Sequence, residues 1–185
     1  MILIGIPCTD YIRAKTVATL ISLVKSDPTL VVTIKQGCYI HKNREEIAEE
    51  AVKGGYSHLF FIDADMCFSA QVLKRLLSHN KDIVGGVYNY RRSTKEPVVR
   101  FADENGNPIN KETPKELFKC FALGAGCMLI KTSVFKRLKK PWFFLGEPDN
   151  QLGEDIYFCK IATEAGIDVW GDPNMDIGHV GEYIF

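Results

Sequence analysis

Two aspartates, separated by one alanine, end the apolar stretch LFFIDADM at residues 59–66. In an extended segment residues i and i+2 share a face, so Asp63 and Asp65 are expected to lie side by side. Their charges would repel each other, which calls for a cation between them or for water around one of them. Beyond the end of a buried strand, such a pair suits a hard divalent cation such as Mg²⁺ or Mn²⁺. The alternative is a turn that caps the next helix, for which one Asp suffices.

A second acidic pair, Glu154 and Asp155, opens a predicted helix after Gly153. Carboxylates in a first turn complement the helix dipole, which is worth about 0.3–1 kcal/mol. The functional alternative is that one of them acts as a general base toward an acceptor hydroxyl. The pair alone does not decide between these two roles.

Two further polar segments follow predicted strands. His179 lies in IGHVG, where an imidazole can complete a metal site that carboxylates begin. Pro7, Thr9 and Asp10 follow the first strand, where a turn can present backbone and side-chain groups to a ligand. The sequence contains neither G-x-G-x-x-G nor G-x-x-x-x-G-K-[ST], so no dinucleotide or P-loop site is indicated. The other three histidines are expected to be surface or packing residues: His41, His58 and His79.

Hydrophobic periodicity and turn residues predict the elements that position these groups. Predicted strands cover residues 1–6, 30–34, 58–62, 82–87 and 167–170, and predicted helices cover 12–24, 43–52, 69–77, 132–138 and 154–165. Up to residue 90 the order is β-α-β-α-β-α-β, which predicts a parallel sheet covered by helices. The first helix has apolar residues at helical spacing (Val17, Leu20, Ile21, Val24), and Ser69 is a plausible cap of the third.

The second half breaks this rhythm. Residues 91–116 are polar and rich in turns, with one strand expected near 97–101, and therefore predict a small antiparallel excursion. An apolar segment follows at 118–130, interrupted by Gly124-Ala125-Gly126. The prediction is one α/β domain over residues 1–185.

Composition excludes several classes of protein. Of the 185 residues, 46% are hydrophobic and 25% are charged, as in ordinary globular proteins. Lys plus Arg and Asp plus Glu both number 23, which argues against a nucleic-acid partner. No apolar run reaches the length of a transmembrane segment, and MILIGIPC reads as a first strand, not as a signal peptide. The six cysteines form no C-x-x-C pair, so reduced thiols and a cytoplasmic location are expected.

The ordered set of motifs resembles the GT-A glycosyltransferases, particularly the family 2-like enzymes that use nucleotide sugars. The matches run through nearly the whole chain: IPCTD, NREEIAEEA, FFIDADM, GAGCMLIKTSVFKRL, LGEDIYFCKIATEAG and the late His. D-x-D alone is unspecific, and the order and the intervals carry the resemblance. It implies a single GT-A (Rossmann-like) domain with a nucleotide-binding half at 1–90 and an acceptor-side half at 91–185.

The resemblance also implies roles for individual residues. Asp65 and His179 would bind Mn²⁺ or Mg²⁺, and Asp63 would reach the metal through water or contact the ribose. Asp155 would be the catalytic base of an inverting transfer, supported by Glu154. The remaining roles are nucleotide binding by Pro7, Thr9, Asp10, Arg44, Asp63 and Ala64, and donor-sugar or acceptor contact by Gly124, Ala125, Gly126 and Trp142.

The implied partners are a UDP- or GDP-sugar donor and a glycan or other hydroxyl acceptor. The loop KQGCY departs from the family pattern, because it lacks the acidic residue with which many relatives hold the base. Two other functions stay open: a non-catalytic sugar-nucleotide-binding module, and a phosphatase of the haloacid dehalogenase type, which also has D-x-D after an apolar strand. In those phosphatases the motif stands at the N-terminus and a Thr or Val normally follows it, whereas Met66 follows here. A sugar-nucleotidyltransferase would need an Arg-containing, Gly-rich first loop, which is missing.

Overall fold

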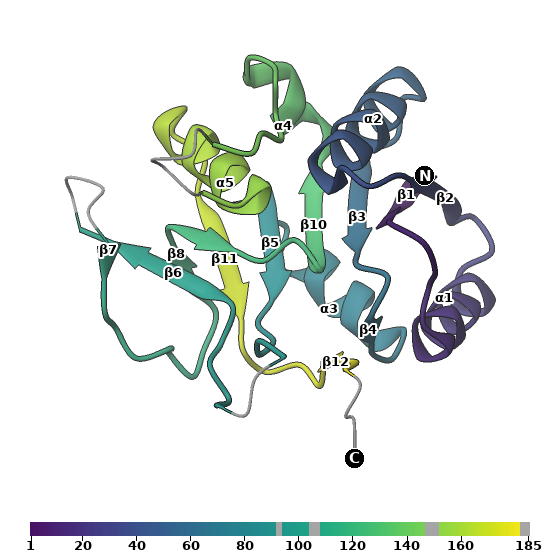
Figure 1. Cartoon of the computed structure of the whole chain (residues 1–185), viewed down its shortest axis with the longest axis horizontal. Helices are drawn as coiled ribbons and strands as arrows, with labels where there is room; N and C mark the ends of the chain where they lie inside the picture. Colours follow the sequence, from purple (N-terminus) through teal and green to yellow (C-terminus); the bar gives the residue numbers. More distant parts are fainter. Residues whose placement is uncertain (92–93, 104–107, 147–151, 182–185) are drawn as a thin grey trace.

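A seven-stranded sheet forms the centre of the protein in the computed structural model, which describes residues 1–91, 94–103, 108–146 and 152–181 (Figure 1). The strand order is β2-β1-β3-β10-β5-β11-β8. The bounds are β1 (Ile2–Cys8), β2 (Val31–Gln36), β3 (His58–Ile62), β5 (Ile83–Gly86), β8 (Phe118–Cys120), β10 (Cys127–Lys131) and β11 (Val169–Asp172). Strands β1, β2, β3, β5 and β11 run in one direction, and β10 and β8 run in the other. The predicted mostly parallel α/β sheet flanked by helices is confirmed.

In the described ranges, five helices cover the two faces of this sheet: α1 (Ala14–Ser26), α2 (Ile40–Lys53), α3 (Gln71–Ser78), α4 (Thr132–Arg137) and α5 (Glu154–Glu164). Side chains alternate between the two faces along each strand. In β3, Leu59 and Phe61 join the core with α2, α4 and α5, whereas Phe60 and Ile62 join the core with α1 and α3. Because both faces are covered, the strands read as apolar runs in the sequence.

Helix α1 buries a different face from the one its apolar spacing indicates. Thr16 and Thr19 are buried, and their hydroxyls donate to the carbonyl oxygens of Ala64 and Phe68. These hydrogen bonds turn the apolar flank of α1, including Val17, toward the surface.

Helix α2 follows its sequence pattern more closely. It begins at Ile40, three residues earlier than expected, and it ends at the predicted Gly54-Gly55, where Gly55 takes a φ of 67°. Ser69 does not cap α3, because the N-cap residue is Ala70 and no side chain makes a capping hydrogen bond there.

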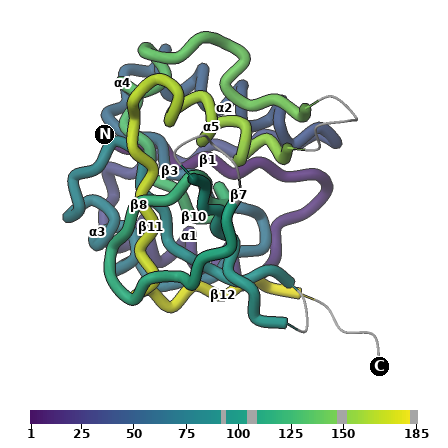
Figure 2. The backbone as a smooth tube through the Cα atoms, turned by 90° about the vertical axis from the view of Figure 1, so that its left-hand side faces the viewer, coloured from purple at the N-terminus to yellow at the C-terminus, as the bar shows by residue number. Residues whose placement is uncertain are grey.

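The part of the chain that the structure describes also contains two small antiparallel sheets. One contains β7 (Pro108–Ile109), β6 (Val99–Ala102) and β9 (Ala122–Leu123), which confirms the predicted antiparallel excursion. The other pairs β4 (Met66–Cys67) with β12 (Gly178–His179). Figures 1 and 2 place β12 at the opposite end of the molecule from α4.

The antiparallel strand β10 begins at the edge of the sheet where β3 and β5 end. It lies between β3 and β5, so its first residues lie beside the last residues of those strands. The amide of Asp63 donates to the carbonyl oxygen of Gly126 at 3.1 Å. Within the described ranges, no helix is long and apolar enough to cross a membrane.

Candidate functional site

The chain turns sharply where the two aspartates follow β3. The amide of Met66 donates to the carbonyl oxygen of Asp63 at 3.1 Å, which closes a four-residue turn. Asp63 and Asp65 therefore do not stand side by side on an extended strand, and that expectation is wrong. Each carboxylate has a cationic side chain of its own.

Arg44 neutralises Asp63 and ties it to the second acidic pair. It lies one turn into α2 with only 3% of its side chain exposed. Its Nη2 donates to Asp63 Oδ1 at 2.6 Å, and its Nε donates to Glu154 Oε1 at 3.1 Å. Burial alone would lower the pKa of Arg44, but the carboxylates of Asp63, Glu154 and Asp155 raise it above its ordinary value. One buried cation thus joins two motifs that are 91 residues apart in the sequence.

Asp65 is held by two other groups. His179 Nε2 lies 3.4 Å from Asp65 Oδ1, and Arg91 Nη1 lies 3.0 Å from Asp65 Oδ2. Burial would raise the pKa of Asp65, but the hydrogen bond with His179 and the charges of His179 and Arg91 outweigh it, so the pKa is lowered. His179 Nδ1 lies 3.0 Å from the carbonyl oxygen of Asn89, to which it can only donate. Nε2 is therefore the nitrogen that faces Asp65 and can bind a metal.

Asp155 sits in the first turn of α5, beside Glu154. Its Oδ1 accepts from the amide of Ile156 at 2.8 Å. Burial and the neighbouring charge of Glu154 raise the pKa of Asp155 to about 6, although Arg44 acts against them. Asp155 also lines a small cavity of about 220 Å³, together with Gly124 and other residues. A carboxylate with this pKa beside a cavity has the properties of a general base.

The residues present fit a divalent cation only in part. Among the described residues no group of three or more His, Cys, Asp or Glu side chains is arranged to hold a metal ion. Asp63 is bound to Arg44, which leaves Asp65 and His179 as the two ligands that converge. Mg²⁺ characteristically keeps several waters and takes one or two protein carboxylates plus substrate phosphates, so two protein ligands fit a cation that a diphosphate completes.

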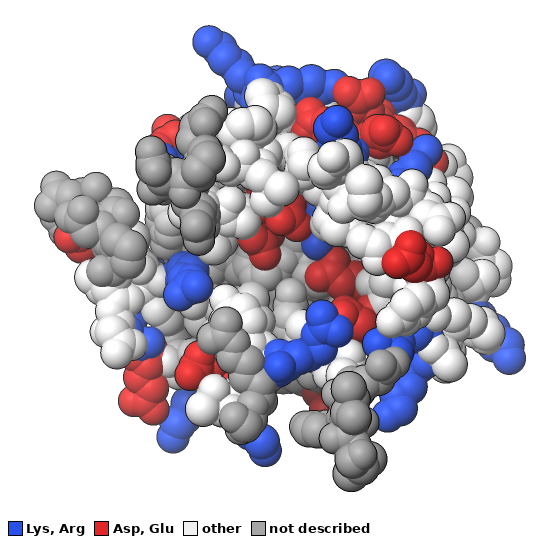
Figure 3. Space-filling model, viewed as in Figure 1, with Lys and Arg blue, Asp and Glu red and all other residues white. Residues whose placement is uncertain are grey.

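The surface around these groups is hollowed. Figure 3 shows Asp and Glu side chains around a hollow near the centre of the viewed face, with Lys and Arg side chains at its margin. Because the side chains around the hollow are acidic, they favour a ligand that binds together with a cation.

Tyr88 is a residue of this site that the sequence analysis missed. The buried amide of Gly126 donates to Tyr88 Oη at 3.0 Å. A Cβ at Gly124 would come within 2.3 Å of Tyr88 Oη, and a Cβ at Gly126 within 2.6 Å. Burial raises the pKa of Tyr88 well above its ordinary value. The glycines of GAGC thus make room for Tyr88, whereas the expected reason for them was close approach of a donor sugar; Ala125 between them is buried.

Trp142 does not face the site. It is 6% exposed and packs against Phe135 with ring centroids 4.9 Å apart, so its side chain belongs to the core. The residues expected to bind a nucleotide through the first loop lie at the end of β1, where Thr9 and Asp10 are exposed and Pro7 is buried.

A second network, which the sequence analysis also missed, holds the end of β11. Asp172 is fully buried, and its Oδ2 accepts from Arg75 Nε at 2.6 Å and lies 2.7 Å from His79 Nε2. His79 was expected to be a surface or packing residue. The carbonyl oxygen of Asp172 accepts from the amide of Val87, which fixes the segment that leads into Tyr88. The signal in the sequence was a lone Asp at the end of an apolar strand.

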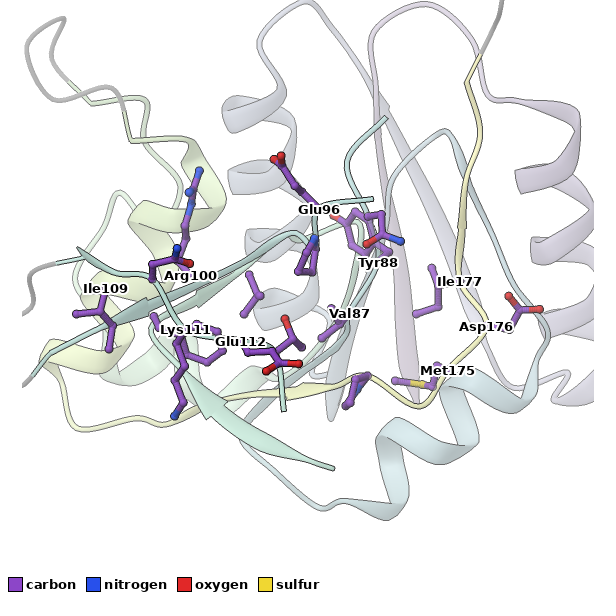
Figure 4. A pocket seen from close by; sticks show the side chains of 17 residues that line it. Val87, Tyr88, Glu96, Arg100, Ile109, Lys111, Glu112, Met175, Asp176 and Ile177 are labelled. Carbon is purple, nitrogen blue, oxygen red and sulfur yellow. The ribbon is translucent and has the colours of Figure 1, made fainter. Parts of the chain in front are cut away.

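Tyr88 also lines a larger cavity of about 1110 Å³, together with residues of β6 and β7 from the antiparallel excursion. Figure 4 shows Arg100, Ile109 and Lys111 on one side of it, and Met175 and Ile177 on the other. Its walls combine apolar and charged side chains. Residues from the first half of the chain, such as Tyr88, and from the second half, such as Lys111, thus line this cavity together.

Comparisons with known proteins find a similar fold and give no indication of function. No family model and no curated protein matches the chain. Among solved structures, the crystal structure of A197 from STIV matches with a TM-score of 0.70 and 20% sequence identity, over 98% of this chain and 86% of that one. At this identity the likeness concerns the arrangement of the backbone alone.

Proposed function

We propose that this protein is a metal-dependent glycosyltransferase that moves a sugar from a UDP- or GDP-sugar to a hydroxyl acceptor. The observation that carries the proposal is the bridge made by Arg44. Its contacts with Asp63 and Glu154 bring the D-x-D turn, and with it the pair Asp65–His179, to the same edge of the sheet as Asp155. A leaving-group site and a base for the acceptor are the two parts that such a transfer needs.

The chain's own residues divide this work between them. Asp65 and His179 Nε2 would hold the cation, which offsets the charge of the departing diphosphate when bound. Asp155 would accept the proton of the acceptor hydroxyl while the oxygen of that hydroxyl bonds to the anomeric carbon of the donor sugar. The bond from that carbon to the phosphate oxygen breaks, and its electron pair leaves with the nucleoside diphosphate. Arg44 would hold Asp63 and Glu154 in place during this exchange.

Calorimetric titration with UDP and with GDP, with and without Mn²⁺, tests this proposal. We expect one of the two nucleotides to bind in the presence of Mn²⁺ and to bind much more weakly without it. In the Asp65→Ala variant the advantage given by Mn²⁺ should disappear. If neither nucleotide binds with Mn²⁺ present, the proposal fails.

Asp155→Asn separates an enzyme from a non-catalytic sugar-nucleotide-binding module. The variant keeps the shape of the side chain but cannot accept a proton, so it should bind nucleotide like the wild type while transfer or hydrolysis of the sugar is lost. Equal turnover in both proteins would remove Asp155 from the mechanism. Absence of turnover in the wild type with every donor tested, together with Mn²⁺-dependent nucleotide binding, would favour the binding module.

A phosphatase of the haloacid dehalogenase type would use Asp63 as its nucleophile. Asp63 Oδ1 lies 2.6 Å from the buried guanidinium of Arg44, which reduces its nucleophilicity. Assay with p-nitrophenyl phosphate and Mg²⁺ tests this alternative directly, and we expect no hydrolysis above the rate of the Asp63→Asn variant.

A further inference from the structure

Arg91 pairs with the proposed cation ligand Asp65, and the transfer described above gives this arginine no role. Its Nη1 lies 3.0 Å from Asp65 Oδ2, whereas His179 Nε2 faces the other oxygen, Oδ1, at 3.4 Å. A guanidinium therefore lies at the place where the proposed site takes up its cation and its diphosphate.

A hairpin fixes the backbone that carries Arg91. The amide of Val98 donates to the carbonyl oxygen of Tyr88 at 2.8 Å, and the amide of Tyr90 donates to the carbonyl oxygen of Glu96 at 2.9 Å. Arg91 is the next residue along the chain. Because the backbone is held up to this point, the guanidinium reaches other partners by rotation of its own side chain.

The same segment also holds His179, the second proposed ligand of the cation. The carbonyl oxygen of Asn89 lies 3.0 Å from His179 Nδ1, and this contact directs Nε2 toward Asp65. The short segment 89–91 thus contacts both cation ligands. A change in the group that Arg91 binds therefore takes place directly beside the proposed cation.

Arg91 is far more exposed than Arg44, the other arginine of the site. The side chain of Arg91 is 48% exposed, against 3% for that of Arg44. Ion pairs at such an exposed position contribute little to stability, because water solvates both partners when they separate. Arg91 can therefore leave Asp65 at small cost, whereas the buried Arg44 cannot leave Asp63 in the same way.

A diphosphate on the same cation as Asp65 would lie within reach of Arg91. Bonds from Mg²⁺ to oxygen are about 2.1 Å long, so two oxygens on one such cation are at most about 4 Å apart. Arg91 Nη1 already lies 3.0 Å from the carboxylate of Asp65. Rotation of the side chain is therefore enough to move its donors from the carboxylate to a phosphate oxygen.

The charges at the site favour this movement. While no cation is bound, Arg91 offsets the charge of Asp65. A divalent cation that Asp65 and His179 hold takes over this part and repels the guanidinium. A diphosphate brings several negative charges to the same place, and the planar guanidinium can donate to two of its oxygens at once.

We propose that Arg91 binds the diphosphate group of the donor, and that it pairs with Asp65 only while no cation is bound there. The inference rests on the proposed function, because it takes the diphosphate of a nucleotide sugar as the ligand. Arg91 opposes binding of the cation alone and favours binding of the cation with the diphosphate, so it makes the binding of the two cooperative.

Titration of the Arg91→Gln variant tests this exchange, because the substitution has opposite effects in two experiments. Mn²⁺ alone should bind about two- to fivefold more tightly than to the wild type, since no guanidinium competes for Asp65. The Mn²⁺ complex of inorganic pyrophosphate should bind about tenfold more weakly, since the diphosphate loses a charged donor. Arg91→Lys keeps the charge without the planar fork and should fall between the two proteins.

Arg137→Gln is the matched control. Arg137 is 49% exposed and pairs with Asp82, and it ends α4, at the opposite end of the molecule from β12. Both affinities should therefore equal those of the wild type. Circular dichroism establishes that each variant is folded.

Chemical labelling follows Arg91 in the wild-type chain and so does not depend on the folding of a variant. Phenylglyoxal modifies exposed guanidinium groups, and mass spectrometry measures the modification of each arginine. Mn²⁺ alone should speed the modification of Arg91, because its ion pair with Asp65 opens. Mn²⁺ with pyrophosphate should slow it about fivefold, whereas Arg137 should react at the same rate throughout.

The inference is overturned if the wild type does not bind the Mn²⁺ complex of pyrophosphate, or if Arg91→Gln binds it equally well. Weaker binding of Mn²⁺ alone by Arg91→Gln also overturns it, since Arg91 then only positions Asp65. Failure of the proposed function gives a different result. If the two opposite changes are found while neither UDP nor GDP binds, the diphosphate site stands and the glycosyltransferase proposal fails.

Discussion

Replacing Arg44 by methionine tests whether one buried cation holds the two acidic motifs together. Methionine keeps much of the volume of the side chain and removes the guanidinium from Asp63 and Glu154. Both carboxylates then stay beside an apolar group without a cation. Removing one partner of a buried ion pair costs about 3–5 kcal/mol. Asp63 and Glu154 keep 29% and 17% of their side chains exposed, so water solvates them in part, and we expect the lower end, about 3 kcal/mol.

Urea denaturation of Arg44→Met measures this loss as a change in the free energy of unfolding. Arg137→Met is the matched control, because Arg137 pairs with Asp82 at 3.6 Å on the exposed surface and should change stability by no more than about 0.5 kcal/mol. Adding Asp63→Asn and Glu154→Gln to Arg44→Met should recover much of the loss, since the two side chains that bonded to Arg44 then carry no charge. A loss below about 1 kcal/mol for Arg44→Met would refute this reasoning.

Three further predictions follow from the site. Because folding raises the pKa of Asp155 from 3.8 to about 6, its charged form costs the folded state about 3 kcal/mol above that pH, and the cost vanishes as the pH falls toward 3.8. Asp155→Asn should therefore be more stable than the wild type to urea at about pH 8, with no such gain at about pH 4. Arg91→Gln frees Asp65 of an exposed ion pair and should tighten Mn²⁺ binding by about two- to fivefold in calorimetry without nucleotide. Gly124→Ala should destabilise the fold by about 1–3 kcal/mol in thermal melts, and by somewhat less in a chain that also carries Tyr88→Phe, because the nearest atom to the new Cβ is the Tyr88 hydroxyl at 2.3 Å, whereas the contact with Val98 Cγ1 at 2.6 Å stays. Additive effects of these last two changes would contradict the contact with the hydroxyl.

Hydrophobic periodicity predicted most elements in the first half of the fold well, because most of them have a continuous buried apolar face. Strand β3 and helix α2 have such faces, and the structure places both close to their predicted bounds. Helix α1 shows the limit of periodicity. Its bounds are nearly as predicted, yet two threonine hydroxyls, by bonding to distant carbonyls, select the buried face against the apolar spacing. The spacing of residues does not encode such a partner 48 residues away.

The candidate site was predictable as a set of residues and not as a set of contacts. The D-x-D stretch was found because it ends an apolar run, the acidic pair because it opens α5, and the late His because it follows the last predicted strand. The contacts among them depend on Arg44 and Arg91, and nothing local to either arginine indicates which carboxylate it meets. Tyr88 was missed for a similar reason, since its hydroxyl meets a glycine amide that is 38 residues away.

The short strand β12 makes the proposed cation site able to open locally while the central sheet stays folded. His179 reaches Asp65 on a strand whose pairing with β4 comprises two residue pairs, supported by the bond from the amide of Val180 to Asp65 at 2.7 Å. Such a short pairing opens far more readily than the central sheet does, and amide hydrogen exchange reports that opening separately from global unfolding. A ligand that joins Asp65 to His179 fastens β12 to β4, so occupancy of the site can be read as slowed exchange at Val180, without any measurement of turnover.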